Sequence, residues 1–267
     1  MTLDPVALRQ AAESFAREAG QIVREGWGRS HTPERKGRID LVTEYDRRSE
    51  ALLLERIRAR FPDHAILAEE SGAHPRRDAP ARWVLDPLDG TTNFAHNYPF
   101  FAVSVAVEVG GVPAAGAVYD PVRDEMFSAA LGRGATLNGA PARVSTIDRL
   151  EDALLVTGFP YDVRERPERV MPAFQAFLQR AQGIRRDGSA ALNLCYLAIG
   201  RFDGFWEVAL SPWDTAAGSL IVLESGGRVT DYAGEAFRLT GAPILASNGR
   251  LHAEMLRILD GAGPPPS

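Results

Sequence analysis

The stretch that decides the fold runs from residue 83 to residue 94: Trp83-Val84-Leu85-Asp86-Pro87-Leu88-Asp89-Gly90-Thr91-Thr92-Asn93-Phe94. Its apolar start predicts a buried strand that ends at Asp86, where Pro87 takes the chain out of the hydrogen-bond ladder. Asp89 follows three residues later, close enough for both carboxylates to converge on one ion. Gly90 permits a close backbone approach or a positive φ. The pattern therefore predicts a cation site at a strand end.

The residues that follow suit a phosphate beside that cation site. Thr91 and Thr92 stand where a helix can begin, so their free N–H groups can bind an anion. Carboxylates are hard ligands that suit Mg²⁺, Ca²⁺ or Mn²⁺. A lone aspartate is more often a turn or cap residue, and Asp214 could simply cap the helix that follows it.

Two distant acidic segments weaken that simpler interpretation. Glu69 and Glu70 follow an apolar run at residues 65–68, and Asp214 follows Trp213. Three separate segments would have to imitate one metal site by chance, so we expect them to meet around divalent ions.

Outward from this segment, the N-terminal part begins with two helices. Asp4 and Pro5 suit a helix start, and the apolar residues from Leu8 to Ile22 recur at helical spacing. Thr43 and Asp46 resemble a capping box for the second helix. Alternating runs at residues 103–130, with a Gly-Gly turn at 110–111, predict an antiparallel sheet with helices to one side.

The part after residue 150 alternates strand-like and helix-like runs, which is typical of an α/β arrangement. We therefore expect an N-terminal α+β half at residues 1–148 with most metal ligands. A C-terminal α/β half at 149–260 would supply Asp214 and Glu207. Residues 261–267 are rich in Pro and Gly and are expected to form a flexible tail. The absence of a low-complexity linker predicts two tightly packed halves.

Composition excludes several classes of protein. The 267 residues are 45% apolar and carry a formal charge of −5, which argues against a dedicated nucleic-acid binder. The single cysteine, Cys195, allows no intrachain disulfide and fits the core. The five scattered histidines do not suggest a zinc site.

The N-terminus does not resemble a signal peptide, and no apolar run could span a bilayer. We therefore expect a cytoplasmic protein.

The segment at residues 86–94 resembles the signature of the inositol monophosphatase family. Residues 67–71, 211–218 and 224–227 match further family elements, as do 40–43, Asp46 and 188–192. The similarity extends from about Asp40 to Asn248. It implies a layered α-β-α-β-α sandwich, of mixed α+β and α/β class, as in inositol monophosphatase and fructose-1,6-bisphosphatase. It also implies a homodimer, and inhibition by Li⁺ that displaces one Mg²⁺.

The resemblance also implies residue roles. Glu69, Asp86 and the carbonyl of Leu88 would bind a first metal ion, and Asp86, Asp89 and Asp214 a second. A weaker third ion would be held by Glu69 and waters, and Mn²⁺ could replace Mg²⁺.

Other implied roles concern water and substrate. Glu70 and Thr91 would orient or activate the attacking water. Asp46 would act indirectly, through its contacts with these residues. Gly90, Thr91 and Thr92 would hold the phosphate. The alcohol moiety would contact the following residues: Gly188, Ser189, Ala190 and Glu207.

The chemistry is coherent on physical grounds. Hydrolysis of a phosphate monoester requires on the order of 20 kcal/mol of transition-state stabilisation, and one general acid supplies only about 10²–10⁴-fold. Paired divalent ions neutralise the phosphate and stabilise the leaving oxygen. The resemblance implies that inositol 1-phosphate is the ester hydrolysed in this way. Fructose-1,6-bisphosphatase, histidinol-phosphate phosphatase and 3′-phosphoadenosine-5′-phosphate phosphatase activities are alternatives, and association with RNA polymerase is an alternative of another class.

The roles of two charged features near residue 188 stay open. Arg185 and Arg186 could form a solvated face or approach the substrate or a partner subunit. Asp187 adds a negative charge where relatives often carry a small or apolar residue.

Overall fold

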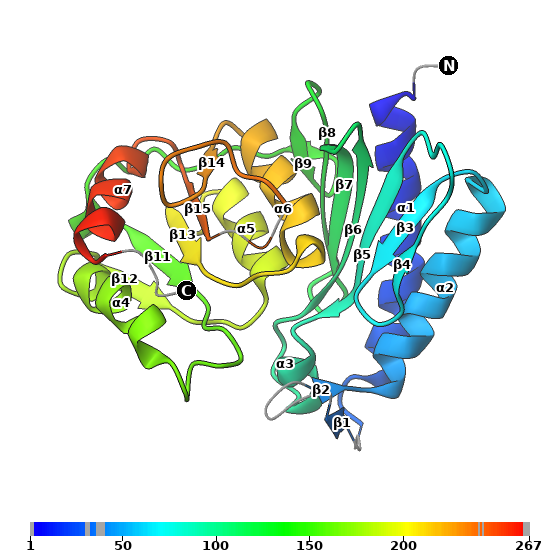
Figure 1. The fold of residues 1–267 in the computed structure, drawn as a ribbon, viewed down its shortest axis with the longest axis horizontal. Helices are drawn as coiled ribbons and strands as arrows, with labels where there is room; N and C mark the ends of the chain where they lie inside the picture. The colour runs from blue at the N-terminus through cyan, green and yellow to red at the C-terminus, as the bar shows by residue number, and fades with distance from the viewer. Residues whose placement is uncertain (1–2, 30–32, 36–40, 240, 242, 264–267) are drawn as a thin grey trace.

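The computed structural model describes residues 3–29, 33–35, 41–239, 241 and 243–263, and these form five stacked layers (Figure 1). Helices α1 and α2 cover one face of a large sheet, α5 and α6 lie between that sheet and a smaller one, and α4 and α7 cover the far side. The layered α-β-α-β-α sandwich that the resemblance implied is confirmed. The expected tail at 261–267 lies mostly outside the described residues.

The larger sheet has eight strands in the order β10-β9-β8-β7-β6-β5-β3-β4. Neighbours are antiparallel except β3 and β5, which run parallel. Its strands are β3 (Ala65–Ala68), β4 (Gly72–His74), β5 (Arg82–Asp89), β6 (Ala102–Val109), β7 (Val112–Asp120), β8 (Glu125–Ala130), β9 (Ala135–Leu137) and β10 (Ala140–Pro141).

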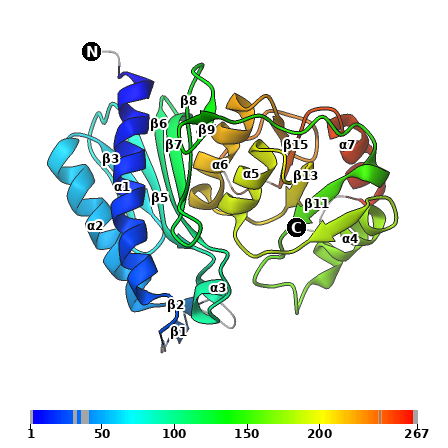
Figure 2. The same cartoon turned by 180° about the vertical axis from the view of Figure 1, so that it is seen from behind.

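Helices cover both faces of this sheet, so the prediction that they lie to one side is wrong. Helices α1 (Pro5–Gly26) and α2 (Glu44–Arg60) lie on one face, and α5 (Ala190–Ala198) and α6 (Pro212–Glu224) lie on the other (Figure 2). The central strands β6 and β7 are buried at almost every position. A strand that is apolar on both faces must be covered on both faces.

Strand β5 also differs from the prediction, because it continues through Pro87 to Asp89. Its register against β6 shifts between Asp86 and Asp89. Pro87 has no N–H to donate, and such an irregularity accommodates a proline without ending the strand. Both aspartates therefore belong to one strand, on either side of the irregularity.

The smaller sheet has five strands in the order β12-β11-β13-β15-β14. β11 pairs in parallel with β12 and β13, whereas β15 is antiparallel to β13 and β14. Its elements are β11 (Leu154–Thr157), α4 (Met171–Leu178), β12 (Gly183–Arg185), β13 (Gly204–Glu207), β14 (Arg228–Thr230), β15 (Ile244–Ser247) and α7 (His252–Gly261). Short pieces complete the fold: β1 (Glu34–Arg35), β2 (Leu41–Val42), α3 (Thr91–Ala95) and two 3₁₀ turns at 150–152 and 167–169. The division at residue 148 stays a prediction.

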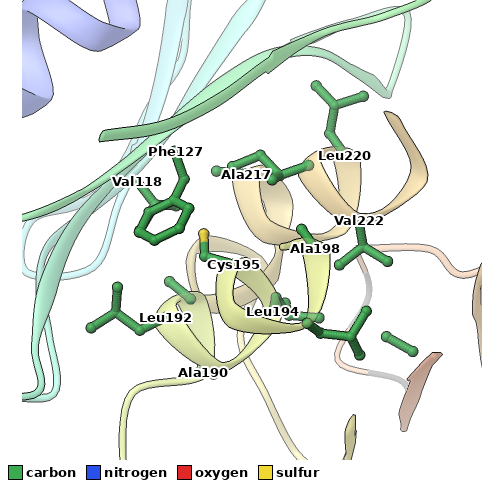
Figure 3. Close-up of a cluster of buried hydrophobic side chains, with 14 of the residues drawn as sticks. Val118, Phe127, Ala190, Leu192, Leu194, Cys195, Ala198, Ala217, Leu220 and Val222 are labelled. Atoms are coloured by element: carbon green, nitrogen blue, oxygen red, sulfur yellow. The ribbon is translucent and has the colours of Figure 1, made fainter. Parts of the chain in front are cut away.

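The layer of α5 and α6 joins the two sheets through one continuous apolar cluster (Figure 3). Cys195 is fully buried there beside Val118 and Phe127 of the larger sheet, as expected for a core residue. A Cβ added to Gly218 would lie 2.7 Å from the Cβ of Leu194, so the two helices approach closely. This packing fixes the starts of α5 and α6 against the end of β5.

Within the described part of the chain, no helix is long and apolar enough to cross a membrane.

Candidate active site

Three aspartates from two elements meet at the junction between the layers. Asp86 and Asp89 come from the end of β5, and Asp214 comes from the first turn of α6. Carboxylate oxygens of all three lie within 4.8 Å of one another. Asp86 and Asp214 are 128 positions apart in the sequence, and the packing of α6 against β5 brings them together.

One oxygen of each aspartate is held by a fixed donor. The N–H of Leu88 donates to Asp86 Oδ1 at 3.0 Å. The N–H of Ser211 donates to Asp214 Oδ2 at 2.7 Å, which forms a capping box at the start of α6. Asp214 therefore caps its helix and faces the cluster at the same time. These bonds orient the second oxygen of each carboxylate.

Asp89 is held by the start of α5. Its Oδ2 accepts from the hydroxyl of Ser189 at 2.5 Å and from the N–H of Ala191 at 2.8 Å. The N-terminus of a helix favours negative charge. The helix therefore stabilises ionised Asp89 and joins β5 to the opposite layer.

The cluster raises the pKa of each of its carboxyls. Burial is the largest cause, and it raises the pKa of Asp86 and Asp214 well above the ordinary value. Negative charges on Glu69 and on the other aspartates raise them further. Burial raises the pKa of Asp89 only to about 6, because the donors at α5 oppose it. Such a cluster needs positive charge to stay ionised.

Glu69 and Glu70 occupy different positions. Glu69 lines the same cavity as Asp89 and Asp214, and its charge acts on Asp86. Glu70 lines an adjoining cavity of about 470 Å³ that shares Glu69 with the first. The structure thus brings Glu69 to the aspartates and places Glu70 in the lining of the adjoining cavity only. The role of Glu70 stays a prediction.

Asp46 is fully buried and organises the loop after β5. Its Oδ2 accepts from the N–H and hydroxyl of Thr43, which confirms the capping box. Its Oδ1 accepts from the hydroxyl of Thr91 at 2.9 Å. The carbonyl of Leu88 also accepts from that hydroxyl, at 3.0 Å. Because the Thr91 proton points toward these acceptors, its oxygen can accept a hydrogen bond from the cavity.

Gly90 has a φ of 96°, a left-handed conformation that favours glycine. A Cβ there would lie 3.0 Å from the carbonyl oxygen of Phe100. Gly90 and Thr91 line the cavity together with the exposed Thr92. The three residues that the sequence predicted to hold a phosphate therefore line one cavity, and that role stays a prediction.

The wall across from α3 carries the other predicted substrate residues. Gly188, Ser189, Ala190 and Glu207 all line the cavity. Burial raises the pKa of Glu207 to about 8, although the charge of Arg186 opposes the shift. A Cβ on Gly158 would collide with the Glu207 carboxyl. Gly158 thus makes room for Glu207, which the sequence did not indicate.

The cavity that these residues line has a volume of about 580 Å³, within the usual range for small-molecule sites. It receives residues from the end of β5, from α3 and from the starts of α5 and α6. Arg186 also lines it, whereas Asp187 is half-buried beside it and points its backbone carbonyl to Asn93 Nδ2 at 2.7 Å.

Sequence reasoning missed two residues of α2 that hold the site. The hydroxyl of Ser49 donates to the carbonyl of Pro87 at 2.8 Å. The buried carboxylate of Glu50 accepts from the N–H groups of Glu70 and Ser71 at 2.8 and 3.0 Å. Both residues share a helix face with Asp46 through i+3 and i+4 spacing, which could have revealed them. One face of α2 therefore holds both the segment that contains Pro87 and the turn at Glu70 and Ser71. Asp40, which the family resemblance also included, lies outside the described residues.

The donor set fits a hard divalent cation. The convergent ligands are carboxylate oxygens, and such ligands suit Mg²⁺, Mn²⁺ or Ca²⁺. The Leu88 carbonyl accepts from the Thr91 hydroxyl, and its role as a metal ligand stays a prediction. The raised carboxyl pKa values show that the cluster lacks positive compensation of its own. A cation would supply that compensation.

Comparisons with known proteins agree with this arrangement. The family model described as the inositol monophosphatase family matches residues 4–262. An inositol-1-monophosphatase from Synechocystis is 48% identical over 242 residues, which cover 90% of this chain and 84% of that protein. The Nus factor SuhB of Escherichia coli is 43% identical, with 90% and 91% coverage.

Solved structures show the same fold. An inositol monophosphatase from Anabaena superposes with a TM-score of 0.87 at 42% identity and covers 97% of each chain. The extragenic suppressor protein suhB from Bartonella henselae gives a TM-score of 0.90 at 38% identity, covering 95% of this chain and 98% of that one. With the match over nearly its whole length and the acidic cluster at the junction of the layers, this chain belongs to the inositol monophosphatase family.

Proposed function

We propose that the protein hydrolyses a small phosphate monoester with the help of divalent cations, and that inositol 1-phosphate is its substrate. The observation that carries the proposal is the convergence of Asp86, Asp89 and Asp214 within 4.8 Å beside a cavity of about 580 Å³. The similarity to the inositol-1-monophosphatase of Synechocystis supports this substrate.

The metal ligands in this proposal are Glu69, Asp86, Asp89, Asp214 and the carbonyl of Leu88. We propose two or three Mg²⁺ ions, with Mn²⁺ as a substitute and Li⁺ as an inhibitor. When bound, such ions neutralise the phosphate, lower the pKa of water and stabilise the leaving oxygen.

The protein's own residues position water and substrate. The Thr91 hydroxyl donates to Asp46, so its oxygen can accept from the attacking water and orient it. We propose that Glu70 takes part in the same task across the turn. Gly90, Thr91 and Thr92 would hold the phosphate. Gly188, Ser189, Ala190 and Glu207 line the part of the cavity that remains for the alcohol.

A phosphate-release panel tests this proposal. We expect rapid Mg²⁺-dependent release from inositol 1-phosphate, and slower release from fructose 1,6-bisphosphate, histidinol phosphate and 3′-phosphoadenosine 5′-phosphate. A chelator should abolish release, because the carboxylate cluster alone repels a phosphate dianion. Equal turnover of all four substrates would reject the assignment to inositol phosphate, and release that survives the chelator would reject the metal mechanism.

Glu50 provides a second test of the site. In Glu50→Gln, an NH₂ group replaces one acceptor and faces a backbone N–H, which costs ~1–3 kcal/mol. The turn that carries Glu69 should then be less well positioned, and kcat should fall by ~10–100-fold. We also expect the Mg²⁺ concentration for half-maximal activity to rise.

The matched control is Glu55→Gln, on the exposed side of the same helix. It should leave kcat and the Mg²⁺ requirement unchanged. If Glu50→Gln lowers only the melting temperature and leaves both kinetic quantities intact, then Glu50 has no positioning role.

The similarity to relatives named Nus factor SuhB supports a second candidate function, association with a transcription complex. The catalytically impaired Asp89→Asn form should still capture RNA polymerase from a lysate if this association exists. We also propose a cytoplasmic homodimer, on the basis of the family resemblance.

A further inference from the structure

Asn93 connects two walls of the cavity through its side-chain amide. It lies in α3, directly after the two threonines proposed to hold the phosphate, and it lines the cavity. Its Nδ2 donates to the carbonyl of Phe100 at 2.7 Å and to the carbonyl of Asp187 at 2.7 Å. Phe100 lies just before β6 of the larger sheet, whereas Asp187 lies between β12 of the smaller sheet and α5. One amide group therefore joins α3 to a segment 94 positions further along the chain.

The carbonyl of Asp187 belongs to the segment that is proposed to contact the alcohol. Gly188, Ser189 and Ala190 follow it directly. Gly188 has a φ of 85°, and a Cβ there would lie 3.2 Å from the Nδ2 and from the Oδ1 of Asn93. A side chain at position 188 would therefore be strained and would press on the amide. Glycine at this position lets the segment approach α3 closely enough for the hydrogen bond.

A second link holds the same segment at the acidic cluster. The Ser189 hydroxyl and the N–H of Ala191 donate to Asp89 Oδ2. That link fixes the start of α5 relative to the proposed metal ligands, and the Asn93 link fixes it relative to the residues proposed for the phosphate. Because Asn93 binds the backbone carbonyl of Asp187, its link does not depend on which side chain stands at position 187.

We propose that Asn93 is a positioning residue that sets the distance between the proposed phosphate-binding residues and the alcohol-binding segment, and thereby favours polyol esters. This inference rests on the proposed phosphatase function and concerns its choice of substrate. The amide is uncharged, so it acts through the two carbonyls that it holds rather than by attracting the phosphate.

The physical reason is the narrow range of hydrogen-bond lengths. A hydrogen bond tolerates a change of only a few tenths of an ångström between donor and acceptor. Hydroxyl groups of the alcohol can therefore bond to the segment at Ser189 only when that segment lies at the right distance from the bound phosphate. Misplacement by about 1 Å can lower a rate by on the order of 10²-fold. An ester whose alcohol has no hydroxyl groups makes no such bonds and does not depend on this distance.

The test compares the wild type with Asn93→Ala on two esters, with Mg²⁺ present. Inositol 1-phosphate presents hydroxyl groups to the alcohol-binding segment, whereas 4-nitrophenyl phosphate has none on its ring. We expect the variant to lower kcat/KM for inositol 1-phosphate by ~10–100-fold and that for 4-nitrophenyl phosphate by at most ~3-fold. The ratio of the two kcat/KM values does not depend on how much of the variant is folded, because both are measured on the same preparation.

A second variant and a matched control accompany this comparison. Asn93→Asp keeps the size of the side chain but has no N–H to donate when ionised. Its new charge acts on the same phosphate group in both esters, so the ratio should still fall. Asn138→Ala is the control, because Asn138 Nδ2 also donates to a backbone carbonyl, that of Asp124 at 3.0 Å, but lies outside the cavity lining. It should lower the melting temperature and keep the wild-type ratio.

The outcomes separate this inference from the proposed function. If both Asn93 variants lose activity equally toward the two esters, or lose none, Asn93 does not set the distance and the inference is wrong. If the wild type hydrolyses another ester of the substrate panel but not inositol 1-phosphate, that ester takes its place in the same ratio. If the wild type releases phosphate from none of these esters, the phosphatase proposal is wrong, and this inference is rejected with it.

Discussion

Replacement of Asp214 by asparagine is expected to lower kcat/KM for phosphate release by ~10³-fold, the upper range for loss of one preorganised electrostatic group. Asp214 contributes an oxygen to the three-aspartate cluster. The change removes one negative charge from the ligands of the proposed second ion. Asparagine keeps an oxygen that can accept from the N–H of Ser211, so the capping box of α6 should persist.

The fold of this variant should therefore survive. Removing one of several buried like charges relieves repulsion, so the metal-free variant should melt at or above the wild-type temperature. Asp231→Asn is the control, because Asp231 accepts from Ala233 and Glu235 in a turn outside the cavity lining. It should leave kcat/KM unchanged. Normal turnover by Asp214→Asn would contradict the two-metal site, and Asp89→Asn should repeat the loss.

The second large effect concerns stability and metal binding. Saturating Mg²⁺ at ~100 times its dissociation constant should stabilise the folded protein by ~2.7 kcal/mol. For a chain of this size, that corresponds to a rise of ~5–10 °C in the melting temperature. The cation compensates the buried charges of Asp86, Asp89 and Asp214. Differential scanning calorimetry with Mg²⁺ and with a chelator measures the difference.

The pH dependence follows from the direction of the pKa shifts. Folding raises the pKa of Asp89 from 3.8 to about 6 and that of Glu207 from 4.5 to about 8, in both cases chiefly by burial. Between the unfolded and folded values, the folded state binds more protons. The free energy of unfolding due to these groups therefore falls as the pH rises through those windows.

The metal-free protein should thus be more stable at about pH 5.5 than at about pH 8, and Mg²⁺ should stabilise it more at the higher pH. The metal-free Asp214→Asn variant should show a weaker pH dependence, since one contributor to the cluster is gone. A melting temperature that is insensitive to Mg²⁺ at both pH values would show that the aspartates do not bind the ion.

Local pattern predicted much of the secondary structure. The caps at Asp4 and Thr43 and the turn at Gly110 all appear where the sequence indicated. These features depend on contacts within a few residues, so the local sequence contains the information for them. The continuation of β5 past Pro87 was missed, because only the partner strand β6 determines whether a proline ends a strand or lies in an irregularity.

For the site, the sequence by itself predicted which residues would carry the chemistry. Acidic residues after apolar strands and the Gly-Thr-Thr run marked Glu69, Asp86, Asp89 and Asp214, and the family resemblance gave them roles. The residue types follow from the ligand preferences of hard cations, which do not depend on the fold.

Only the tertiary structure decided how these residues meet. Ser189 at α5 holds Asp89, Glu50 on α2 holds the Glu70 turn, and Gly158 makes room for Glu207. Each contact joins segments that are at least 20 residues apart. The physical reason is that such contacts depend on how helices pack on both faces of the sheet, and this packing is fixed by burial across the whole chain rather than by any local pattern.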